Sequence, residues 1–319
     1  MKNLVRRSVN KINKIFWEAG SDIKKTSNNQ LADQITYRVV SETILNNESK
    51  GKKPNEVFYG ISDDFWFWLN TEGVRRNSTI RDFLPGLPDE ATQLLYTALK
   101  GDAALHEAFG FYLAFKEQYK KHKGEIKNTH SVLDFGCGWG RIIRFFIKDF
   151  QATNIWGCDP VPGMIELCKE QNIWCNFETI DTAPPTPFLE NQFDAIYSYS
   201  VFSHLSEEMH LNILTEIKRI LKPGGLYFTT TRNRRFIESG FANTDSLRAF
   251  PDTQKALNQY DKGLFSHHSF NDKNWPYWGE TAISKNYVLS QWTREFKFID
   301  FLELDRQNLI VVQKPLVVD

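Results

Sequence analysis

One short run near the middle of the chain constrains the fold more than any other: residues 132–141, which read VLDFGCGWGR. An apolar stretch containing one acid leads into three glycines on alternate positions, and residues 142–150 continue with an amphipathic pattern. This order is typical of a buried parallel strand, a tight turn and a helix. Glycines in such a turn allow a ligand close to the backbone and to the N–H groups of the following helix. The run therefore predicts a ligand site, and a turn that serves packing alone is the alternative.

The glycine spacing separates two classes of cofactor. A dinucleotide fingerprint reads G-x-G-x-x-G and faces a pyrophosphate, whereas Gly136, Gly138 and Gly140 are spaced G-x-G-x-G. Asp134 stands two positions ahead of them, where a carboxylate would repel a pyrophosphate but attract a cation. This disfavours a NAD(P)-dependent oxidoreductase. The run resembles motif I of the class I S-adenosylmethionine-dependent methyltransferases, whose cofactor carries a sulfonium and an ammonium.

Later segments are similar to the same family, in the same order. Residues 155–160 resemble the second strand, with Asp159 at its end. In the family the matching acid accepts hydrogen bonds from the ribose hydroxyls, although such an acid can also cap the next helix. Residues 174–181 supply either an acid or a backbone group near adenine, and residues 193–200 resemble the fourth strand. The resemblance implies S-adenosyl-L-methionine as the cofactor, bound by Asp134, Gly136, Cys137, Gly138, Gly140, Asp159, Pro160, Ile180, Asp181, Tyr199 and Ser200.

The resemblance also implies an α/β fold: a doubly wound, mostly parallel seven-stranded sheet of order 3-2-1-4-5-7-6 with strand seven antiparallel. Residues 126–319 would form this core. We expect a helix to end at the LKPGG run of residues 221–225, with strand five following it. Residues 232–281 show no strand–helix alternation and are interpreted as an insertion. After it come a helix at 284–295 and a closing antiparallel hairpin from 296 to 314.

Residues 1–125 are predicted to form a separate helical cap. Residues 2–17 form a basic amphipathic pattern that either contacts an anionic membrane or docks on protein, and a polar loop follows at 20–30. The segment 57–87 is rich in aromatic residues, which either pack the cap or line a substrate pocket. Asp89 and Asp102 are expected to cap two helices, the second with a core stripe at Leu105, Ala108, Phe109, Tyr112, Phe115 and Tyr119.

Composition narrows the partners. Lys and Arg together equal Asp and Glu at 39 each, so no net charge draws the protein to nucleic acid. The four cysteines, which have no C-x-x-C spacing, are Cys137, Cys158, Cys168 and Cys175. They indicate buried thiols of a reducing, cytoplasmic compartment. Residues 2–17 leave open a peripheral contact with the inner face of the membrane. We expect no metal site, and we expect the adjacent His267 and His268 to be exposed without ligating partners.

The expected reaction is methyl transfer to an oxygen, or a nitrogen, of a small-molecule or glycan-type acceptor. His204 follows strand four and is the candidate base, although its ring can instead hydrogen-bond the turn. Glu280 is the second candidate, and Trp66, Trp275 and Tyr277 are candidate substrate contacts. Residues 62–68 and 277–281 resemble bacterial methyltransferases of unassigned substrate. A catalytically inactive scaffold or partner subunit is the alternative.

Overall fold

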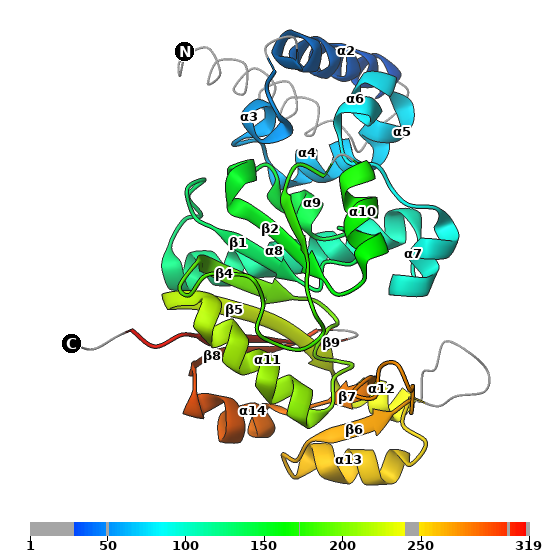
Figure 1. Cartoon of the computed structure of the whole chain (residues 1–319). Helices are drawn as coiled ribbons and strands as arrows, with labels where there is room; N and C mark the ends of the chain where they lie inside the picture. Colours follow the sequence, from blue (N-terminus) through cyan, green and yellow to red (C-terminus); the bar gives the residue numbers. More distant parts are fainter. Residues whose placement is uncertain (1–28, 49–50, 172, 240–248, 305–306, 317–319) are drawn as a thin grey trace.

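The computed structural model describes residues 29–48, 51–171, 173–239, 249–304 and 307–316. The predicted basic segment 2–17 and most of the predicted loop 20–30 lie outside these residues. In the described chain before the sheet, the regular elements are all helices (Figure 1). Its elements are α2 (Asn29–Glu48), α3 (Pro54–Phe58), α4 (Asp63–Trp68), η1 (Leu69–Gly73), α5 (Val74–Arg76), α6 (Ser78–Phe83), α7 (Glu90–Thr97) and α8 (Gly101–Lys123).

Side-chain caps explain where several of these helices begin. The Ser62 hydroxyl accepts a hydrogen bond from the Phe65 N–H at the start of α4, and the Asp89 carboxylate accepts one from the Thr92 N–H at the start of α7. The cap at Asp89 was predicted. Asp102 was predicted to cap α8 but lies inside its first turn, where a negative charge still favours the helix dipole. All six residues of the predicted α8 stripe are buried.

The second half of the chain forms one mixed sheet. Its strands are β1 (Val132–Phe135), β2 (Ile155–Asp159), β3 (Asn176–Thr179), β4 (Phe193–Ser198), β5 (Leu221–Arg232), β6 (Ser266–Ser269), β7 (Gly279–Ala282), β8 (Lys297–Glu303) and β9 (Gln307–Gln313). The main path runs β3-β2-β1-β4-β5-β9-β8, with β9 antiparallel to β5. This is the predicted order 3-2-1-4-5-7-6, with β8 and β9 as strands six and seven. The β6–β7 hairpin joins the end of β5 through one pair, Arg232 with Ala282.

Helices cover both faces of the sheet. Side chains of α8, α9 (Ile143–Phe146) and α10 (Pro162–Glu170) belong to one hydrophobic cluster, and those of α11 (Glu207–Ile220) and α14 (Lys285–Gln291) belong to another. Short 3-10 turns precede β2 and follow α14, at η2 (Ala152–Asn154) and η3 (Trp292–Arg294). α9 is much shorter than the predicted helix at 142–150, because turns replace helix on either side of it. α11 ends before Leu221, which instead pairs with Phe193 as the first residue of β5.

Residues 232–281, where the sequence showed no strand–helix alternation, nevertheless contain regular elements. The insertion contains α12 (Arg234–Ser239), α13 (Thr253–Asp261) and the β6–β7 hairpin. In Figure 1 it lies at the end of the molecule opposite α2–α6. No helix in the described residues is long and apolar enough to cross a membrane.

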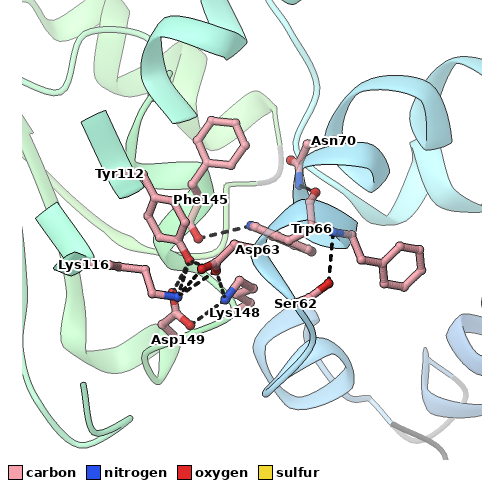
Figure 2. A network of polar contacts seen from close by, with 10 residues as sticks. Ser62, Asp63, Trp66, Asn70, Tyr112, Lys116, Phe145, Lys148 and Asp149 are labelled. Atoms are coloured by element: carbon pink, nitrogen blue, oxygen red, sulfur yellow. Dashed lines mark hydrogen bonds and ion pairs between the residues drawn. The ribbon is translucent and has the colours of Figure 1, made fainter. Parts of the chain in front are cut away.

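The helical region is fastened to the core by polar contacts (Figure 2). Trp66 is fully buried, and its Nε1 donates to the Phe145 carbonyl at 3.1 Å. Asp63 accepts from the Lys148 ammonium at 2.7 Å and from the Tyr112 hydroxyl at 2.8 Å. The aromatic segment therefore packs the helical region onto the core, and Trp66 has no exposed surface to offer a substrate.

Candidate functional site

The three glycines of the turn after β1 do different work. All three have positive φ, at 81° for Gly136, 50° for Gly138 and 76° for Gly140. A Cβ on Gly136 would lie 2.4 Å from the Val201 side chain, and one on Gly140 would lie 2.3 Å from Ile173. A Cβ on Gly138 would meet nothing within 4 Å. Two glycines thus serve packing, and the third borders open space that a ligand can approach.

Asp134 lies in β1 immediately behind this turn and is 2% exposed. Its Oδ2 accepts a hydrogen bond from the Tyr197 hydroxyl at 2.9 Å. Burial raises the pKa of Asp134 to about 8, although the bond from Tyr197 lowers it. A carboxylate can accept about four hydrogen bonds. A cation bound beside Asp134 would therefore stabilise its ionised form.

Asp159 ends β2 and holds the turn from the neighbouring strand. Its two oxygens accept from the backbone N–H groups of Gly138 and Val161, each at 2.9 Å. Burial raises the pKa of Asp159, against the lowering effect of these two N–H groups. Because each carboxylate oxygen has a second lone pair, the group can still accept hydroxyl donors. The predicted ribose acid thus also braces the glycine turn.

The remaining predicted cofactor residues surround this edge unevenly. Ile180 is buried and donates its N–H to the Asp159 carbonyl at 3.2 Å, Pro160 is half-buried, and Asp181 is exposed. Cys137 is buried beside the Gly138 carbonyl, with its sulfur 3.7 Å from the oxygen. All four cysteines are free.

The exit of β4 forms the other side of the turn. The Arg141 guanidinium lies over the Tyr199 ring, with its central carbon 5.2 Å from the ring centre. Ser200 has a φ of 62° and donates its N–H to the Thr230 hydroxyl, which redirects the chain out of the sheet. Val201 then packs against the Gly136 backbone. The β4 exit is therefore in contact with the glycine turn.

The charge of Asp159 also acts on Tyr96 of α7, which the sequence did not single out. Burial raises the pKa of Tyr96, and the negative charge of Asp159 raises it further. The Gly86 N–H also donates to the Gln171 carbonyl at the end of α10, which fixes the segment before α7 against the core. An isolated tyrosine in a short helix carried no pattern that could have identified it.

The predicted acceptor residues His204 and Glu280 come together across the sheet edge. His204 Nδ1 lies 2.8 Å from the Gly279 carbonyl oxygen and 3.9 Å from Glu280 Oε1. Glu280 is 8% exposed and accepts from Arg232 Nε at 2.9 Å. Burial lowers the pKa of His204, while the charge of Glu280 opposes that effect. The structure therefore contains a half-buried histidine and a paired carboxylate beside the β4 exit.

The aromatic candidates at this edge are half-buried. The rings of Trp275 and Tyr277 lie 6.0 Å apart in a T-shaped arrangement, and the Tyr277 carbonyl accepts from the Ser206 N–H. His267 and His268 were predicted to be exposed but are half-buried in β6, and His267 Nδ1 lies 2.8 Å from the Thr281 hydroxyl. Within the described residues no group of three His, Cys, Asp or Glu side chains is arranged to hold a metal ion.

These residues fit a cationic adenosine cofactor. Gly138 leaves its backbone open, Asp134 is a buried acid without a paired cation at hydrogen-bond distance among the described residues, and Asp159 has lone pairs left for hydroxyl groups. Such a cofactor supplies an electrophilic methyl group on a sulfonium. The chain would hold it with Asp134, Gly138 and Asp159.

Comparison with known proteins agrees with this fit. Residues 132–225 match a family model described as a methyltransferase domain. A fatty-acid O-methyltransferase from Mycolicibacterium smegmatis is 29% identical over 106 residues, which cover 33% of this chain and 38% of that protein. A probable tRNA methyltransferase 9B from Mus musculus is 31% identical over 111 residues, which cover 33% of this chain and 23% of that protein.

A solved structure of a SAM-dependent methyltransferase from Aquifex aeolicus has a TM-score of 0.41 and 15% identity, with coverage of 64% of this chain and 88% of that one. The match to the two curated relatives spans well under half of the length of each. Residues 132–225 are therefore similar to a methyltransferase domain, in agreement with the resemblance to the class I S-adenosylmethionine-dependent methyltransferases.

Proposed function

We propose that the protein transfers the methyl group of S-adenosylmethionine to an oxygen of a small-molecule or glycan-type acceptor. Methyl transfer from a sulfonium is an in-line displacement, so the protein has to align the acceptor and exclude water. A hydroxyl acceptor must also lose a proton, which requires a base. Either His204 or Glu280 supplies this base in our proposal, with Trp275 and Tyr277 as an apolar wall.

One observation carries the proposal: His204 and Glu280 lie 3.9 Å apart after the carboxyl end of β4, and the His204 N–H donates to the carbonyl of Val201, which packs on the glycine turn. In doubly wound sheets ligands bind at this edge. The relative from Mycolicibacterium smegmatis is named a fatty-acid O-methyltransferase, which agrees with an oxygen acceptor. Trp66 is fully buried, so we no longer include it among the substrate contacts.

Acceptor identity in this proposal depends on the helical region and on the insertion at 232–281, because both differ from the methyltransferase core. The name of the Mus musculus relative includes tRNA, but the equal numbers of acidic and basic residues give no charge that favours nucleic acid. Membrane contact through residues 2–17 stays a prediction. Full-length protein and protein lacking these residues should then partition differently onto anionic vesicles, most strongly at low salt.

The experiment uses cofactor binding first and turnover second. Calorimetric titration with S-adenosylmethionine separates an active fold from an inactive scaffold. Once an acceptor has been found, loss of the base should lower turnover by about 10²–10⁴-fold while cofactor affinity is unchanged. Near-normal turnover in both His204→Ala and Glu280→Gln would contradict the assignment of a base.

A further inference from the structure

The insertion is joined to the β4 exit by a short antiparallel ladder. The Gly279 N–H donates to the His204 carbonyl, the Ser206 N–H to the Tyr277 carbonyl and the Thr281 N–H to the Ser203 carbonyl, each at 2.8 Å. Leu205 and Trp278 form an antiparallel bridge in the middle of this ladder. The insertion therefore holds the backbone of His204 and of the residues before and after it.

The side chain of His204 is held by the same segment. Its Nδ1 lies 2.8 Å from the Gly279 carbonyl oxygen, and a carbonyl oxygen can only accept a hydrogen bond. Nδ1 must therefore carry the proton, which leaves the lone pair of a neutral imidazole on Nε2. The imidazole ring also stacks on the Trp278 indole, with ring centres 4.5 Å apart and planes at 14°.

We propose that Trp278 and Gly279 are positioning residues that orient His204, so that His204 Nε2, and not Glu280, is the base of the proposed methyl transfer. Gly279 fixes the tautomer through its carbonyl group, and Trp278 fixes the plane of the ring. This inference rests on the proposed function, since a base is needed only for an acceptor that loses a proton.

The contacts of Glu280 explain why it is not the base. Arg232 donates from Nε to Glu280 Oε2 at 2.9 Å and from Nη2 to Oε1 at 3.4 Å. Both oxygens of Glu280 are therefore occupied by N–H donors of Arg232, which leaves the carboxylate poorly placed to take a proton from an acceptor. At 3.9 Å from His204 Nδ1, its charge instead stabilises the imidazolium that forms when His204 takes a proton.

Charged groups around His204 act in both directions. Burial lowers the pKa of His204, the charge of Glu280 raises it and that of Arg232 lowers it, and the half-buried His267 lies nearby on β6. The net lowering keeps the ring neutral near pH 7, which is the form that accepts a proton.

Gly279 is the position where the geometry tolerates least change. A Cβ there would lie 2.0 Å from the His268 carbonyl oxygen and 2.7 Å from His267 Cε1. Any larger residue would push β6 and β7 apart and move the carbonyl that His204 contacts. Trp278 is therefore the better position for a test, because its ring can be changed with the backbone left in place.

The test reads the histidine directly and needs no acceptor. Long-range nitrogen–proton spectra of the full-length protein report the tautomer and the pKa of each imidazole, and His204→Gln identifies the His204 signals. We compare wild type with Trp278→Leu and with the conservative Trp278→Phe. Phe270→Leu is the matched control, because Phe270 is an aromatic residue of the same insertion that is 44% exposed.

We expect wild type, Trp278→Phe and Phe270→Leu to show His204 protonated on Nδ1 with a pKa below the usual 6.5. Trp278→Leu should give a mixture of tautomers and, with a known acceptor, a turnover reduced by about 10–10²-fold at unchanged cofactor affinity. A proton on Nε2 in wild type, or a Trp278→Leu spectrum identical to wild type, would overturn the inference. Failure to bind S-adenosylmethionine would instead overturn the proposed function.

Discussion

Two acids in this protein, Asp63 and Asp134, lie in opposite electrostatic surroundings. Asp63 accepts hydrogen bonds from the ammonium groups of Lys116 and Lys148 and from the Tyr112 hydroxyl (Figure 2). Burial alone would raise the pKa of Asp63, but Lys148 and Lys116 lower it to about 2. Asp134 has a hydroxyl where Asp63 has two cations, and burial raises its pKa to about 8.

The two acids differ in the source of the positive charge that balances them. In the cluster around Asp63 the chain supplies it, since Lys148 is 2% exposed and also contacts Asp149 at 2.7 Å. At Asp134 the charge of Arg141 lowers the pKa less than burial raises it, and Arg141 itself pairs with Glu107. The complete charge cluster holds the helical region on the core, whereas the incomplete one is, in our proposal, a site for a cation.

The largest effect on stability should come from breaking the complete cluster. Asp63→Ala leaves Lys148 buried with one acid fewer, so the free energy of unfolding should fall by about 2–3 kcal/mol, below the range for a fully buried pair because Asp63 is partly exposed. Asp64→Ala changes an exposed acid in the same helical turn and should cost less than about 1 kcal/mol. Urea unfolding measures both, and equal losses would show that the cluster contributes nothing.

The reverse pattern is expected at the incomplete cluster. Asp134→Asn keeps an acceptor for the Tyr197 hydroxyl, so the free energy of unfolding should change by about 1 kcal/mol or less. It removes the negative charge, so affinity for S-adenosylmethionine should fall by about 1.5–3 kcal/mol, roughly 10–150-fold. Unfolding curves and calorimetric titration give the two numbers. A large loss of stability with unchanged affinity would reverse our assignment of the two regions.

A smaller effect is expected in acid. The pKa of Asp63 is lower in the folded protein than in the unfolded chain, so its contribution to stability is present above about pH 4 and is lost as pH falls through about 2. The difference in unfolding free energy between wild type and Asp63→Ala should therefore narrow by about 1–2 kcal/mol over that range. A difference in unfolding free energy that does not change with pH would mean that the neighbouring lysines do not lower the pKa of Asp63.

Local sequence patterns were sufficient to predict the strands β1, β2 and β4 and the glycine turn. The run around Asp134 and the acid at Asp159 are signals within a few residues of their strands, and strand order follows from the family resemblance. His204 and Glu280 were predicted as alternative candidates because His204 leaves strand four at one edge and the segment ending at Glu280 re-enters the core there; the structure has them 3.9 Å apart. The further roles of Gly136 and Gly140 in packing depend on Val201 and Ile173, which no local pattern connects to them.

The features that were missed depend on distant partners. β6 reads SHHS and has no apolar alternation, and it becomes a strand because β7 pairs with it and the β4 exit pairs with β7. The cluster at Asp63 joins three separate segments, at α4, α8 and the residues after α9. Polar residues in such clusters carry no periodic signal, since their spacing in sequence is unrelated to their contacts.

The central claim is that the glycine turn and Asp134 bind a cationic cofactor, and proton release on binding tests it most directly. Titration with S-adenosylmethionine near pH 7, in two buffers that differ in ionisation enthalpy, counts the protons released. Because the pKa of Asp134 is about 8 before binding, wild type should release close to one proton more than Asp134→Asn. Protons released by the cofactor itself are the same in both titrations and cancel in the comparison. No binding, or equal proton release by the two proteins, would contradict the account.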